Sequence, residues 1–160
     1  MKYPQPINGD DTINVAVEIP MGTRNKLEVD EHGRTWVDRV VMTPYPVNYG
    51  YIGNTLAKDG DPLDVVLYSE DPLPTGAFVR SEVYGYLEVY DNGIADHKVI
   101  ARPVWERDMG FNPDSIKSFF SAYKEGVRVG ALHPRESAIN LIEESIFRAR
   151  SMGREQMPLR

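Results

Sequence analysis

The stretch FVRSEVYGYLEVYDNGIADHKVI, residues 78–100, decides the fold. Apolar and polar residues alternate along its first arm, which is typical of half-buried β-strands. Between the arms lies Asn92-Gly93, and an Asn-Gly pair in this setting favours a tight hairpin turn because both residues tolerate positive φ. The stretch therefore predicts two antiparallel strands. Because Asp91 and Asp96 flank the turn, we expect them to lie close together in space.

The same alternation predicts further strands upstream. In residues 12–19, branched apolar residues alternate with a second, more polar face that carries Glu18. In residues 26–30, Lys26 and Glu28 share one face, about 6.6 Å apart along the strand. The remaining strand candidates are residues 36–42, the segment 48–52 that follows Pro44-Tyr45-Pro46, and the short apolar run 64–68.

Helices are expected only after the strands. Asn112 fits an N-cap, Pro113 the first helical position and Gly126 the end of a first helix. A second helix is expected from about Pro134 to Arg150, with a buried stripe of Ala138, Leu141, Ile142 and Ile146. This order indicates an α+β fold, a small closed or nearly closed barrel with two C-terminal helices packed on it. We expect residues 1–150 to form one domain and residues 151–160 a polar tail.

Composition limits the class of protein. The 160 residues are 41% hydrophobic and 26% charged, and none is cysteine, which is typical of a globular protein and excludes disulfides and thiolate metal sites. No run approaches the roughly 18 apolar residues of a membrane span, and the N-terminus lacks the apolar core of a secretory signal. We therefore expect a cytoplasmic protein without a membrane partner. The net charge of -6 also disfavours nucleic acid.

Acidic residues are concentrated in one stretch. From Asp59 to Asp71 the chain has no Lys or Arg, and the segment DGDPLD at residues 59–64 places Asp59, Asp61 and Asp64 on a Gly/Pro turn. Hard cations such as Mg²⁺ prefer oxygen ligands, so this spacing indicates a divalent-metal site. A solvated Asp-rich turn or a structural Ca²⁺ loop would use the same residue types. The EF-hand pattern is not matched, because its central Gly and distal Glu are missing.

Other polar residues suggest what such a metal would do. Asp96 and Lys98 are expected on one face of the strand that returns from the hairpin; alone they would indicate an ordinary surface ion pair. Further cations and phenols on patterned elements are Lys26, Arg39, Tyr49, Tyr123 and Lys124. Metal-binding carboxylates combined with such donors are what phosphoryl chemistry requires, because an anionic substrate must be neutralised in the transition state.

The sequence lacks the motifs of several other catalytic mechanisms. The sequence has no G-x-x-x-x-G-K-[ST] nucleotide loop, no G-x-S-x-G elbow and no H-E-x-x-H helix. Its histidines, His32, His97 and His133, are expected to be structural or exposed residues near turns or helix starts. Only His97, beside Asp96, has a carboxylate at ligand spacing.

Taken together, these motifs resemble the family I soluble inorganic pyrophosphatases, in particular the bacterial members. The family signature D-[SGDN]-D-[PE]-[LIVMF]-D is present as residues 59–64. The other blocks, in family order, are VEIP (17–20), NKLE (25–28), VDR (37–39), YPVNYGYI (45–52), the Asp91/Asp96/Lys98 hairpin and FFSAYK (119–124). The resemblance implies an OB-like five-stranded barrel, Mg²⁺-dependent hydrolysis of inorganic diphosphate and a homohexamer. It implies several Mg²⁺ ions per subunit, with Mn²⁺ or Zn²⁺ as substitutes.

Roles follow from the same resemblance, position by position. Asp61 matches the general base that orients or deprotonates a metal-bridged water. The matched metal ligands are Asp59, Asp64 and Asp96 for the first activating metal, with Asp64 also touching the second, Asp91 with Asp96 for a metal that arrives with substrate, and Glu18 and Glu28 for a further metal. The matched substrate-binding residues are Arg39, Tyr123 and Lys124 for one phosphate and Lys26, Tyr49 and Lys98 for the rest of the diphosphate.

The chain departs from the family pattern at two positions of these blocks. Leu27 replaces the usual aromatic residue, and Ala122 stands where many bacterial members have a histidine in a region tied to subunit contacts. Two other functions are compatible with parts of the pattern. One is an OB-type binder of nucleic acid or polyphosphate without turnover, which the negative charge opposes. The other is a catalytically inactive structural subunit, which the complete set of charged positions opposes.

Overall fold

The computed structural model describes residues 2–30, 32–107, 110 and 112–153. All the strands expected from alternation are present. In chain order the elements are β1 (Ile13–Ile19), β2 (Asn25–Val29), β3 (Thr35–Val40), β4 (Asn48–Ile52), β5 (Leu63–Leu67), β6 (Phe78–Asp91), β7 (Ile94–Ala95), β8 (Lys98–Pro103), α1 (Pro113–Ser121), β9 (Val127–Pro134) and α2 (Arg135–Ser151).

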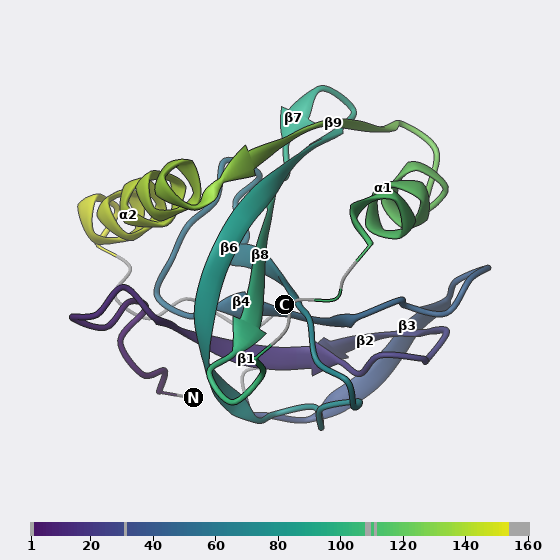
Figure 1. The fold of residues 1–160 in the computed structure, drawn as a ribbon, viewed down its shortest axis with the longest axis horizontal. Helices are drawn as coiled ribbons and strands as arrows, with labels where there is room; N and C mark the ends of the chain where they lie inside the picture. Colours follow the sequence, from purple (N-terminus) through teal and green to yellow (C-terminus); the bar gives the residue numbers. More distant parts are fainter. Residues whose placement is uncertain (1, 31, 108–109, 111, 154–160) are drawn as a thin grey trace.

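Five strands close a barrel. Neighbours pair in the order β1-β4-β5-β8-β6, and β6 pairs back onto β1. Only β5 and β8 are parallel within this ring, and their register sets Asp64 beside Lys98. The strand β6 is long and strongly curved, with α1 and α2 on opposite sides of it, while β2 and β3 form a separate ribbon (Figure 1). The expected α+β barrel is confirmed.

The predicted hairpin is confirmed at its turn. Asn92 and Gly93 both adopt positive φ, 52° and 82°, as a tight turn of this type requires. Tyr90 pairs with Ala95 across it. The returning strand is interrupted, because β7 ends at Ala95 and β8 begins only at Lys98. Asp96 and His97 therefore lie in a short break between two strands.

The core has two main parts, each covered by one helix. On one side, Ala138, Ile142 and Ile146 of α2 pack on barrel residues such as Val65 and Val99. On the other, the α1 residues Ile116, Phe119 and Phe120 pack on the second part of the core. Burying a large apolar side chain contributes about 1.5–3 kcal/mol, so both helices are held mainly by these stripes. The expected buried stripe of α2 is confirmed for Ala138, Ile142 and Ile146.

Two expectations about the C-terminal half are wrong. The first helix begins as expected, with the Asn112 side chain accepting a hydrogen bond from the Asp114 N–H, but it ends at Ser121 rather than near Gly126. The strand β9 then separates the two helices, so the order is not strands first and helices last. Its residues 127–129 do alternate, but Gly130 breaks the pattern because the Glu88 side chain of β6 occupies the space of a Cβ there.

The second face of β1 is not an open polar face. Ala16 packs against Tyr3 and Tyr51, and Glu18 is only 2% exposed. The N-terminal segment and neighbouring strands cover this face, which alternation alone could not reveal. Most of the expected tail, residues 154–160, lies outside the described residues. Within the described part of the chain, no helix has the length and apolarity needed to cross a membrane.

Candidate functional site

A cavity of about 140 Å³ brings the predicted site residues together. Its walls contain all of them except Arg39. The acidic residues in the lining are Glu18, Glu28, Asp59, Asp61, Asp64, Asp91 and Asp96; the basic and phenolic residues are Lys26, Tyr49, Lys98, Tyr123 and Lys124. These residues come from β1, β2, β4, the acidic turn with the start of β5, the hairpin with the start of β8, and the segment after α1. Short-range sequence spacing cannot produce this convergence, which the closed barrel creates.

Lys98 lies at the centre of the buried part of the site. Its ammonium Nζ is 2.6 Å from Asp64 Oδ2 and 3.0 Å from Asp96 Oδ1, and it lies 5.5 Å from the ring centres of Tyr49 and Phe120. Burial disfavours the charged lysine, but the two carboxylates outweigh burial and raise its pKa. The pair expected from Asp96 and Lys98 is thus part of a triad in which Lys98 and Asp64 are buried and Asp96 is half-buried, and it is not a surface ion pair.

Burial disfavours the charged form of Asp96. Burial raises the pKa of the Asp96 carboxyl to about 7, with Lys98 opposing the rise and the Asp64 carboxylate adding to it. One lysine therefore does not fully neutralise two carboxylates in this corner. A divalent cation would supply the missing positive charge.

The acidic turn has two exposed carboxylates and one buried carboxylate. Gly60 adopts a φ of 92°, and the Asp61 N–H donates to Asp59 Oδ1 at 3.0 Å. The Leu63 N–H donates to the buried Thr55 hydroxyl at 2.9 Å, which anchors the far side of the turn. As a result Asp59 and Asp61 are exposed, whereas Asp64 is buried at the start of β5.

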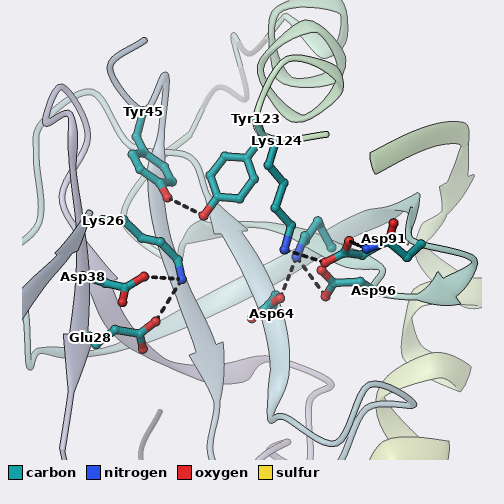
Figure 2. A network of polar contacts seen from close by, with 11 residues as sticks. Lys26, Glu28, Asp38, Tyr45, Asp64, Asp91, Asp96, Tyr123 and Lys124 are labelled. Atoms are coloured by element: carbon teal, nitrogen blue, oxygen red, sulfur yellow. Dashed lines mark hydrogen bonds and ion pairs between the residues drawn. The ribbon is translucent and has the colours of Figure 1, made fainter. Parts of the chain in front are cut away.

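Two further lysines bridge to carboxylates at the mouth of the site. Lys124 Nζ lies 2.7 Å from Asp91 Oδ2, and Lys26 Nζ lies 2.9 Å from Glu28 Oε1 and 3.3 Å from Asp38 Oδ2 (Figure 2). Lys26 is partly buried, which disfavours its charge, yet Glu28 and the other nearby groups raise its pKa overall. The predicted shared face of Lys26 and Glu28 is confirmed.

Tyr123 is held by Tyr45, which was not among the predicted site residues, and by Arg39, which was. The Tyr45 hydroxyl donates to the Tyr123 hydroxyl at 3.1 Å, and the Arg39 guanidinium lies 4.7 Å from the centre of the Tyr123 ring. Arg39 is therefore beside the cavity and reaches it through Tyr123. Tyr45 is 2% exposed, and burial raises the pKa of its hydroxyl. Its position between Pro44 and Pro46 marks it as rigidly placed, but its partner is far away in sequence.

Two of the three histidines have clearer partners than expected. His133 lies on β9, where it stacks on Tyr86 and contacts the Glu88 carboxylate, a partner too distant in sequence for ligand spacing to reveal. His97 Nδ1 accepts a hydrogen bond from the Val89 N–H at 3.2 Å. Both contact residues of β6, whereas His32 is exposed, as expected.

The donor set fits a hard divalent cation. Every acidic group in the cavity offers oxygen, the ligand that Mg²⁺ prefers. Glu28 Oε2 is a buried carboxylate oxygen that accepts no hydrogen bond from the part of the chain described here. In the present arrangement lysines hold several of these carboxylates, and no group of three or more acidic or histidine side chains among the described residues is already spaced for a metal ion. Metal binding would thus require the lysine contacts to rearrange.

Fold and site together define a class: small α+β barrel proteins with a cavity in which acidic groups outnumber cations. Comparison with known proteins shows which family within this class the chain resembles. The family model described as inorganic pyrophosphatase matches residues 15–150. The inorganic pyrophosphatase of Halalkalibacterium halodurans is 40% identical over 153 residues, covering 85% of this chain and 94% of that protein. That of Geobacillus stearothermophilus is 39% identical over the same length, covering 85% and 93%.

A solved structure agrees with these relatives. The crystal structure of an inorganic pyrophosphatase from Neisseria gonorrhoeae has a TM-score of 0.82 and 33% sequence identity, covering 91% of this chain and 96% of that chain. The chain belongs to the inorganic pyrophosphatase family.

Proposed function

We propose that this protein hydrolyses inorganic diphosphate to two orthophosphates in a Mg²⁺-dependent reaction with Asp61 as the general base. Membership of the family makes it an enzyme, an inorganic diphosphatase that cleaves a phosphoanhydride bond. The observation that carries the detailed proposal is the convergence of the acidic and basic residues, from six parts of the chain, on one cavity.

The acidic residues would have two roles, as metal ligands and as the general base. Asp59, Asp64 and Asp96 would hold the activating Mg²⁺, with Asp91, Glu18 and Glu28 available to further ions; Mn²⁺ or Zn²⁺ could substitute. When bound, such ions neutralise phosphate charge and make water more acidic. Asp61 is exposed on the same turn as Asp59, so it can accept the proton of the attacking water. The water oxygen bonds to one phosphorus as the bond to the bridging oxygen breaks.

The basic and phenolic residues would bind the substrate. Lys26, Lys98 and Lys124 already lie against carboxylates in the cavity, so an incoming metal can replace them there and free their charge for phosphate oxygens. Tyr49, Tyr123 and the Arg39 side chain beside Tyr123 complete the donor set. Because the bound anion is surrounded by carboxylates, its charge must be balanced by metal and lysine together, which disfavours long polyanions such as nucleic acid as partners.

The test of this function is phosphate release from diphosphate with excess Mg²⁺, after chelation, and with ATP for comparison. We expect Mg²⁺-dependent turnover selective for diphosphate, and a loss of about 10²–10⁴-fold in Asp61→Asn because a general base contributes that much. Asp71→Asn is the matched control, since Asp71 is an exposed residue of the same acidic stretch that does not line the cavity. Full activity in Asp61→Asn would contradict the assignment of the base.

We also propose that the protein acts in the cytoplasm as a homo-oligomer, a homohexamer as the family resemblance implies. The exposed apolar side chains on and after β3, Trp36 at 46%, Val40 at 58% and Met42 at 93%, offer surface for subunit contact. Sedimentation velocity would measure the assembly. A species of monomer mass at micromolar concentration would contradict it.

A further inference from the structure

A second cavity, of about 170 Å³, lies apart from the site described above. Its walls are formed by the loop that leads into the acidic turn, by the break between β7 and β8, by Tyr86 of β6 and by one face of α2. Its volume is similar to that of the first cavity, about 140 Å³, and well below the roughly 300 Å³ at which sites for larger organic ligands begin. It has room for a small ligand.

Two cations with spare donors line this cavity. Lys58 is exposed, and within the described part of the chain its ammonium forms no ion pair with a carboxylate. Arg148 is half-buried and donates from Nη1 to the Leu56 carbonyl oxygen at 2.6 Å. That hydrogen bond fixes the guanidinium while leaving its other N–H groups available. Cations without a carboxylate partner in a concave site attract anions.

His97 adds a neutral donor of defined orientation. Its Nδ1 accepts the Val89 N–H, so the hydrogen of the neutral ring is on Nε2. The ring lines the cavity and lies 5.4 Å from the ring of Tyr86. The acidic residue in the lining is Glu144, which is exposed on α2. The two cations outweigh its single negative charge.

We propose that this cavity binds a phosphate dianion, either free orthophosphate or the phosphoryl group of a small phosphomonoester. Lys58 and Arg148 neutralise the two charges, and His97 Nε2–H donates to a phosphate oxygen. The site is separate from the diphosphate cavity, and its occupancy does not depend on hydrolysis.

The test is a titration of the ¹⁵N-labelled full-length protein with sodium orthophosphate at constant ionic strength, followed by amide chemical shifts. We expect saturable shifts at Ala57, Leu141 and Ser145, which line only the second cavity. Amides of Tyr123 and Lys124 report the first cavity separately. Lys58→Gln should weaken the affinity measured at the second cavity about tenfold, as loss of one charge-assisted hydrogen bond predicts.

Lys117→Gln is the matched control, because it removes the same charge from α1, away from both cavities. A parallel titration with glycerol 3-phosphate distinguishes the two sources. Saturation by both anions supports recognition of phosphoryl groups in general, and saturation by orthophosphate alone supports a site for the free anion. Absence of saturable shifts, or equal affinity in Lys58→Gln and the unaltered protein, would overturn the proposal.

Discussion

At the scale of single residues, Lys98 determines how the metal-free site is held together. Removing one partner of a buried ion pair is strongly destabilising, because the remaining charge has no counter-charge. Lys98→Met would remove the lysine charge that both the Asp64 and the Asp96 carboxylates contact. We expect the free energy of unfolding, measured by urea denaturation with chelator present, to fall by about 3–5 kcal/mol. Lys117→Met is the control, and an equal effect in both variants would contradict the role of Lys98.

The Asp96 carboxyl predicts a pH dependence of its own. Its pKa is raised by burial from 3.8 to about 7, so the folded protein binds a proton more tightly than the unfolded chain does. This contribution to stability is fully present below the unfolded pKa and is lost as the pH rises through about 7. In chelator, the unaltered protein should lose stability relative to Asp96→Asn across this range. Urea denaturation at a series of pH values would measure the free energy of unfolding of both proteins. The same dependence on pH in the unaltered protein and in Asp96→Asn would contradict the prediction.

At the scale of elements, the pairing of β6 with β9 depends on Gly85. A Cβ at this position would lie 2.2 Å from the His133 carbonyl oxygen, at a point where the pairing of β6 with β8 shifts register. Gly85→Ala should therefore lower the free energy of unfolding by about 1–3 kcal/mol, as overpacking does. Gly9→Ala is the matched control, because no atom of the described residues, apart from its chain neighbours, lies within 4 Å of the position of a Cβ there. Thermal unfolding of both variants provides the measurement. If Gly85→Ala were as stable as the unaltered protein, the two strands could move apart enough to accept a methyl group, and the prediction would be wrong.

At the scale of the whole molecule, the two separate cavities are lined by adjacent residues of the same segments. Lys58 precedes Asp59, and His97 follows Asp96, so the same two segments line both sites. A phosphate dianion in the second cavity adds negative charge near the carboxylates of the first and should raise their affinity for Mg²⁺. We expect glycerol 3-phosphate to lower the Mg²⁺ concentration needed for half-maximal diphosphate hydrolysis. The shift should disappear in Lys58→Gln; no shift, or one of opposite sign, in the unaltered protein would contradict this coupling.

Much of the fold followed from local chemistry. The Asn92-Gly93 turn, the alternating strands and the Asn112 cap act over a few residues, so the sequence alone predicted them. The strand β9 was missed because Gly130 interrupts its pattern for a reason that lies on β6, in the space taken by Glu88. The end of the first helix was misplaced because Gly126 takes its positive φ in the chain after the helix and not at the helix end.

The sequence by itself determined which chemical groups the protein has: oxygen ligands on a Gly/Pro turn, lysines, arginine and phenols at fixed positions in several motifs, and no thiol. The tertiary structure alone decided their partners. Lys98 neutralises Asp64 because a parallel strand pair sets them side by side, and Tyr45 orients Tyr123 although the two residues are 78 positions apart in the sequence. The physical reason is that burial and electrostatic pairing depend on distance in space, which closure of the barrel sets and sequence separation does not.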